Sequence, residues 1–100
     1  RTKDRSDAST YYGPGSTCVN SLVSDGCIIE GQVEDSIIFR GVRVEKGAKV
    51  CGCIVMQDTV IRAGATLKYA IADKNVTITE NRMLMGHSNY PLAISKFSIV

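Results

Sequence analysis

A short aliphatic phrase that recurs at one fixed spacing constrains the fold of this chain more than any other feature. Residues 33–38 (VEDSII) return as residues 50–55 (VCGCIV) and again as residues 67–72 (LKYAIA), at an offset of 17 in both cases. In each copy an aliphatic residue is followed three positions later by a small residue and then by isoleucine. A fixed period of this length, with aliphatic residues at about every sixth position, indicates a solenoid of short strands.

The repeat predicts an all-β domain, built as a single-stranded parallel β-helix of about four coils. Three short strands form one coil, and equivalent residues of successive coils stack about 4.8 Å apart. Two inward stacks are predicted: Val33 over Val50 over Leu67, and Ile37 over Ile54 over Ile71. Residues 20–23 match residues 35–38 at an offset of 15, so we expect the first coil to be shorter than the others.

Composition divides the chain into three predicted segments. Residues 1–16 are read as a linker or N-terminal arm, residues 17–80 as the coils, and residues 81–100 as a C-terminal cap with a last strand. Tyr11 and Tyr12 either cover the open end of the core or belong to an interface with a further domain. Because the chain starts at an arginine and opens on a polar stretch, we expect it to be a piece of a longer protein.

Charge and cysteine usage argue against several classes of function. The net charge is +2, from 12 basic and 10 acidic residues, and no basic run is present, so nucleic-acid binding has little support. No apolar stretch reaches the roughly 18 residues of a membrane-spanning helix. The cysteines at 18, 27, 51 and 53 lack the paired spacing of zinc sites. We interpret them as reduced packing thiols of a cytosolic protein, with a metal or redox role as the alternative.

Two residues are candidates for chemistry. His87 is the only histidine. It is either a solvated loop residue or the general base of an acyltransferase. Lys74 lies at the turn that ends the last clear repeat, where an ammonium group and nearby backbone amides can hold a phosphate. Its alternative is a solvated surface lysine, and Lys96 joins an anion site only if folding brings it near Lys74.

Several stretches resemble the C-terminal prism of bacterial glucose-1-phosphate adenylyltransferases in order and spacing. They are residues 20–31 (NSLVSDGCIIEG), 35–44 (DSIIFRGVRV), 53–56 (CIVM) and 70–75 (AIADKN). The likeness covers about residues 11–100, and the ending, with Tyr90-Pro91 and residues 94–96, is most similar to the glycogen-biosynthesis D-type subunits of that family. The resemblance implies left-handed coils of hexapeptide-type repeats, an exception to the right-handed rule for parallel crossovers.

The resemblance also implies a function for the parent protein. An N-terminal nucleotidyltransferase domain, not contained in this segment, would convert ATP and glucose 1-phosphate into ADP-glucose and pyrophosphate with Mg²⁺. The prism itself would be non-catalytic, without cofactor, and cytoplasmic. Its implied partners are its own N-terminal domain, the catalytic subunit of a hetero-tetramer and sugar-phosphate effectors, with no nucleic acid and no membrane.

Lys74 matches the lysine of the family's Asp-Lys-Asn stretch, which takes part in effector binding in some members. Residues 93–100 do not reproduce the motif that carries the family's later effector lysine. Two alternatives to this function stay open: a hexapeptide-repeat acyltransferase that uses His87, and the prism of another sugar-nucleotide enzyme, such as a guanylyl- or thymidylyltransferase.

Overall fold

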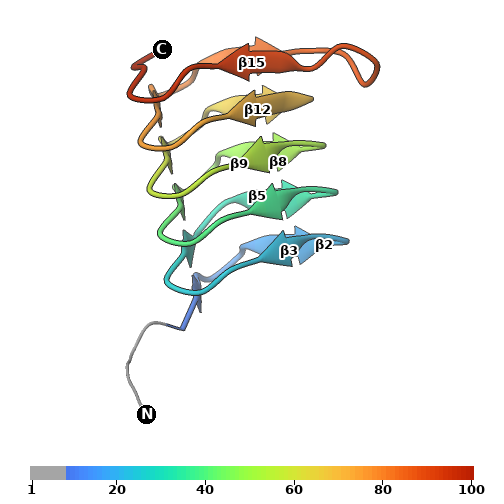
Figure 1. Ribbon diagram of the computed structural model, residues 1–100. Helices are drawn as coiled ribbons and strands as arrows, with labels where there is room; N and C mark the ends of the chain where they lie inside the picture. Colours follow the sequence, from blue (N-terminus) through green and yellow to red (C-terminus); the bar gives the residue numbers. More distant parts are fainter. Residues whose placement is uncertain (1–8) are drawn as a thin grey trace.

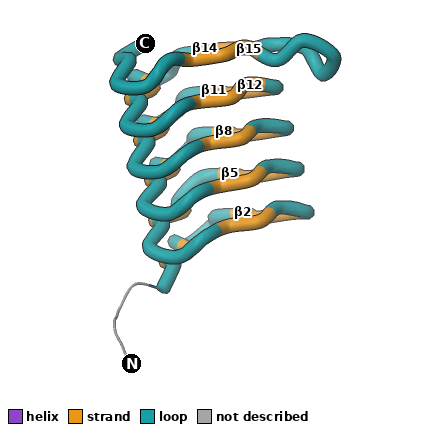
Figure 2. Tube along the Cα trace, in the orientation of Figure 1, coloured by secondary structure: helices purple, strands orange, loops and turns teal. Residues whose placement is uncertain are grey.

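The chain winds into a triangular prism whose three walls are parallel β-sheets. The computed structural model describes residues 9–100, and Figure 1 shows their coils stacked one above another from the N-terminal to the C-terminal end. Strands alternate with turns throughout, and these residues contain no helix that could span a membrane (Figure 2). The structure therefore confirms the predicted all-β parallel solenoid.

Each wall contains five strands, one from each coil. Wall A consists of β1 (Tyr11–Tyr12), β4 (Ile28–Ile29), β7 (Arg43–Val44), β10 (Val60–Ile61) and β13 (Thr77–Ile78). Wall B consists of β2 (Thr17–Val19), β5 (Gln32–Glu34), β8 (Lys49–Cys51), β11 (Thr66–Lys68) and β14 (Met83–Met85). Wall C consists of β3 (Leu22–Val23), β6 (Ile37–Ile38), β9 (Ile54–Val55), β12 (Ala70–Ala72) and β15 (Leu92–Ile94). The sequence-based estimate of about four coils is close to this arrangement.

The strand register follows the repeat in the sequence. Val33 pairs with Val50, and Val50 with Leu67, and all three side chains are at most 2% exposed. This predicted inward stack is confirmed. The core around it is aliphatic and includes Ile29, Ile38, Val44, Val55, Ile61 and Ile78, each fully buried.

The second predicted stack has the right register but faces the wrong way. Ile37 pairs with Ile54 and Ile54 with Ile71, yet Ile37 is 43% exposed and the other two are half-buried. The cause lies in the small residues at 36, 53 and 70, which already point inward. Because side chains alternate along a strand, the next residue points outward and the one after it, at 38, 55 and 72, points inward again.

The shortened first coil has a local cause at the corner between β4 and β5. Leu22 pairs with Ile37 and Gln32 with Lys49, so the first interval between coils is shorter than the next, as the sequence offsets predicted. The corner at residues 30–31 is correspondingly shorter than the corner at residues 45–48. A Cβ atom on Gly31 would lie 2.3 Å from the carbonyl oxygen of Ala48, so only glycine fits this tighter turn.

The two ends of the prism differ from the predicted segment boundaries. The coils begin at β1, inside the predicted arm of residues 1–16, and residues 1–8 of that arm lie outside the described residues. Residues 81–100 cover the core as expected, but they do so as another coil, because β14 pairs with β11 and β15 with β12. The step from Ile71 to its partner Ala93 is longer than the step from Ile54 to Ile71, and the extra residues form the loop that protrudes in Figure 1.

Candidate functional site

The fold brings both predicted anion-binding lysines to one corner of the prism. Between walls C and A, equivalent positions of successive coils carry Asp25, Arg40, Gln57, Lys74 and Lys96. The N–H of Phe97 donates to the carbonyl of Lys74 (3.1 Å), which places Lys96 in the coil next to Lys74. The two lysines are therefore neighbours across a single step of the solenoid, although the protruding loop separates them in sequence.

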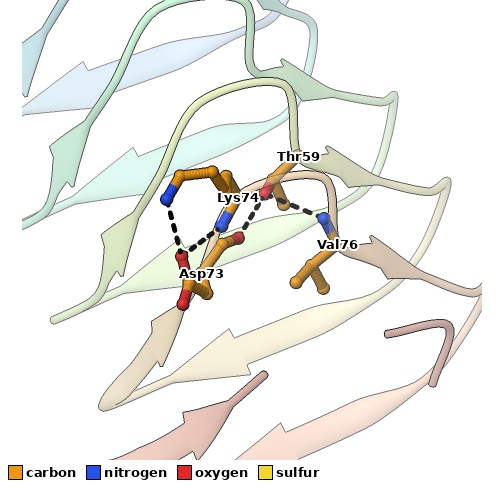
Figure 3. Close-up of polar contacts among 4 residues, drawn as sticks. All are labelled: Thr59, Asp73, Lys74 and Val76. Carbon is orange, nitrogen blue, oxygen red and sulfur yellow. Dashed lines mark hydrogen bonds and ion pairs between the residues drawn. The ribbon is translucent and has the colours of Figure 1, made fainter. Parts of the chain in front are cut away.

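A buried hydroxyl fixes the backbone beneath Lys74 (Figure 3). Thr59, which is fully buried, donates its hydroxyl to the carbonyl of Asp73 (2.9 Å) and accepts from the N–H of Val76 (3.3 Å). Asp73 Oδ1 in turn accepts from the backbone N–H of Lys74 (2.7 Å). Lys74 therefore projects from a corner whose polar groups are satisfied and whose geometry is held from inside.

The lysines at this corner have few charged partners among the described residues. Lys74 Nζ lies 3.9 Å from Asp73 Oδ1, and both side chains are about two-fifths exposed. Such a pair in water contributes little stability, so the ammonium group is free to turn toward an anion. Among residues 9–100, Lys96 forms no ion pair. The corner thus carries two cationic side chains at neighbouring positions of successive coils.

Within the part of the chain that the structure describes, the surroundings of His87 are not a catalytic arrangement. It is exposed in the protruding loop, where its N–H and carbonyl bond the carbonyl and N–H of Tyr90 (3.1 and 2.9 Å). The hollow beside it is lined by Met85, Gly86, Tyr90, Pro91, Leu92 and Ala93. None of these side chains is a nucleophile or a carboxylate that could orient the imidazole, so the structure gives an acyltransferase role no support.

The cysteines are free, and two of them pack in the core. Cys53 Sγ contacts the carbonyls of Cys51 (3.2 Å) and Leu67 (3.3 Å), and Cys27 Sγ contacts that of Phe39 (3.1 Å). Burial raises the pKa of both the Cys27 and the Cys53 thiols. These two are packing thiols, as predicted, whereas Cys18 is exposed and Cys51 lies half-buried on wall B.

The outer face of wall C carries an apolar stripe that includes the three isoleucines of the second predicted inward stack. We define the wall C stripe as Leu22, Ile37, Ile54 and Ile71, which lie on four successive strands. Phe39 (38% exposed) and the half-buried Met56 extend it toward the corner with wall A. At one outward row of wall B the same coils carry Thr17, Gln32, Lys49 and Thr66.

One sequence signal for the stripe was present. Ile37-Ile38 and Ile54-Val55 are aliphatic doublets, and neighbouring residues of a strand cannot both point inward. One member of each doublet must therefore face outward, and an outward aliphatic residue repeated through several coils indicates a surface that another polypeptide covers.

Comparison with known proteins agrees with this geometry. Residues 8–90 match the family described as "GlmU-like, C-terminal hexapeptide". The chain belongs to this family. Its fold is thereby that of the hexapeptide left-handed β-helix, with the hand that the resemblance implied.

The similar curated proteins are adenylyltransferases and a glycogen-biosynthesis protein. The "Glycogen biosynthesis protein GlgD" of Bacillus subtilis is 43% identical over 95 residues, covering 95% of this chain and 28% of that protein. The "Glucose-1-phosphate adenylyltransferase" of Corynebacterium jeikeium is 41% identical over 71 residues, or 70% of this chain and 18% of that protein. The "Glucose-1-phosphate adenylyltransferase" of Acetivibrio thermocellus is 37% identical over 79 residues, which cover 78% of this chain and 18% of that protein. The chain thus spans less than a third of these relatives.

Proposed function

We propose that this chain is the regulatory and assembly domain of a glycogen-biosynthesis subunit of glucose-1-phosphate adenylyltransferase. The observation that carries the proposal is the 43% identity with GlgD over 95% of the chain. The prism itself would be inactive, because the described residues bring together no nucleophile, base and orienting group. Nucleotidyl transfer from ATP to glucose 1-phosphate, with Mg²⁺, would belong to a separate N-terminal domain of the parent protein in the cytoplasm.

The wall C stripe is the surface that this role requires. Burial of exposed aliphatic side chains contributes about 25 cal/mol for each Å² removed from water, and the stripe offers them without an intervening charge. We assign it to docking of the parent's own nucleotidyltransferase domain, and the assembled subunit to a hetero-tetramer with the catalytic subunit. The prism would then act by biasing the conformation of its neighbours.

The corner with Lys74 and Lys96 is proposed as the effector site. A sugar phosphate offers a doubly charged group that two ammonium groups can hold, and Thr59 keeps the corner in place without a bound ligand. Lys74→Gln with Lys96→Gln, in the parent subunit assembled with its partner, should weaken activation by fructose 1,6-bisphosphate by about tenfold or more. Lys46→Gln with Lys49→Gln removes the same charge from the middle coils and serves as the control.

The proposed function is tested by reconstitution. The parent subunit that contains this prism is purified with and without the catalytic subunit, and ADP-glucose formation is measured with the isolated chain alongside. We expect the isolated chain to form no ADP-glucose. We expect the rate of ADP-glucose formation by the catalytic subunit to change when the prism-containing subunit is present. ADP-glucose formation by residues 1–100 alone, or an enzyme indifferent to this subunit, would overturn the proposal.

A further inference from the structure

The last coil exposes several large apolar side chains. Five large apolar side chains of this coil are exposed: Met83 (65%), Met85 (52%), Tyr90 (83%), Phe97 (67%) and Ile99 (75%). At the row of Met83 the coils beneath carry Thr66, Lys49 and Gln32 on wall B. On this row of wall B, the change from polar to apolar occurs at the last coil.

Within residues 9–100, this end also presents unpaired strand edges. β14 and β15 are the outermost strands of walls B and C among these residues, so each is paired there along one edge. A hollow of about 300 Å³ at this end is lined by residues that include Leu84, Leu92, Ile94, Val100 and Arg82. An unpaired edge next to apolar side chains is the arrangement to which an extended segment adds as a further strand.

The charge of the last coil favours one kind of binding partner over others. No aspartate or glutamate follows Glu80 in the sequence, whereas Arg82 and Lys96 both lie in the last coil. Neither cation takes part in an ion pair within residues 9–100. A second copy placed end against end by a two-fold axis would bring these cations against one another. A strand that carries carboxylates would complement them.

We propose that the last coil binds an acidic segment of a different protein chain, which forms two short β-strands joined by a corner. One strand adds to the edge of β14 and the other to the edge of β15. The apolar side chains of the segment cover Met83, Met85 and the hollow, and its carboxylates pair with Arg82 and Lys96. The inference does not depend on the proposed function, although it shares Lys96 with the proposed effector site and β15 with wall C.

A peptide copied from this chain is a suitable probe. Residues 30–38 (EGQVEDSII) form a corner and two strands in walls B and C, and they carry three acids and no base. The peptide is titrated against the ¹⁵N-labelled chain, and the amide signals that move are mapped. A matched peptide with Glu30→Lys, Glu34→Lys and Asp35→Lys is the control.

We expect the acidic peptide to move the signals of β14 and β15. Arg82→Glu with Lys96→Glu should weaken its binding by about tenfold and strengthen binding of the lysine peptide. Lys46→Glu with Lys49→Glu, an equal charge change on the middle coils, should leave both affinities unchanged. The thermal midpoint of each variant checks that the prism is folded.

Three outcomes would overturn the proposal. The two peptides bind equally well, or the moving signals lie on other parts of the prism, or no binding is seen at millimolar peptide. Self-association also overturns it: if signals of β14 and β15 move with the concentration of the chain alone and the sedimentation mass doubles, a second copy is the occupant.

Discussion

Thr59 is the residue on which the Lys74 corner depends. Thr59→Val keeps the shape of the side chain but leaves the carbonyl of Asp73 and the N–H of Val76 without their partner inside the prism. Two unsatisfied buried groups cost about 2–4 kcal/mol of unfolding free energy, whereas Thr59→Ser retains the hydroxyl and should cost about 1 kcal/mol. Urea denaturation measures both. Equal stability of Thr59→Val and the parent chain would contradict this account.

The buried thiols make stability fall at alkaline pH. Burial raises the pKa of Cys53 in the folded state, so the thiol ionises in the unfolded chain first, at about pH 8.5. The contribution of the neutral Cys53 thiol to the free energy of unfolding is fully present below that pH. It is lost as the pH rises through the folded-state pKa. We expect the free energy of unfolding to decrease from pH 8 to 9.5, and to decrease less in Cys53→Ala.

Alanine is a fair replacement at position 53, because Ala70 occupies the equivalent buried position one coil further on. If Cys53→Ala shows the same pH dependence as the parent chain, the Cys53 thiol is not responsible for it.

The corner between β4 and β5 is the element in which the repeat is most constrained. Gly31→Ala places a methyl group 2.3 Å from the carbonyl oxygen of Ala48, and that oxygen is fixed by its bond from the N–H of Gln32. We expect a loss of about 3 kcal/mol, measured as a lower urea midpoint. Gly15→Ala is the control: it has a φ of +78° but no neighbour within 4 Å, so it should cost about 1 kcal/mol. The reverse order of the two losses would contradict the steric explanation.

The elements themselves were largely predictable from sequence, and the reasons for the failures are local. The regular period determined which residues pair, since Val33, Val50 and Leu67 recur without interruption. It did not determine which of Ile37 and Ile38 faces the core, because both are isoleucine and either phase fits the period. The extra loop residues between β14 and β15 interrupt the period, so the sequence predicts a cap where the structure has another coil.

The same insertion explains how much of the candidate site the sequence revealed. The turn after β12 predicts Lys74 as a candidate, whereas the sequence makes Lys96 a member of the candidate site only if folding brings it near Lys74. The spacing between the two lysines matches no multiple of the repeat. Only the strand pairing of β12 with β15 shows that a single step of the solenoid separates them.

In the assembled protein, substitutions in the wall C stripe should affect assembly without affecting folding of the prism. Ile37→Glu with Ile54→Glu places two carboxylates on the outer face of wall C, where water can solvate them. The core beneath, with Ile38 and Val55 fully buried, is unchanged. The urea midpoint should therefore correspond to a loss of no more than about 1 kcal/mol, in contrast to the severe loss that an inward Ile54 would have implied.

Assembly should respond in the opposite way. In the parent protein the two carboxylates would have to be buried against the docked domain, each without a partner, at a cost of several kcal/mol. Sedimentation of the assembled enzyme should show smaller species for Ile37→Glu with Ile54→Glu, and limited proteolysis should release the prism. Gln32→Glu with Thr66→Glu adds the same charge to wall B and should leave assembly intact. An assembly insensitive to the wall C variant would mean that the docking surface is not the wall C stripe.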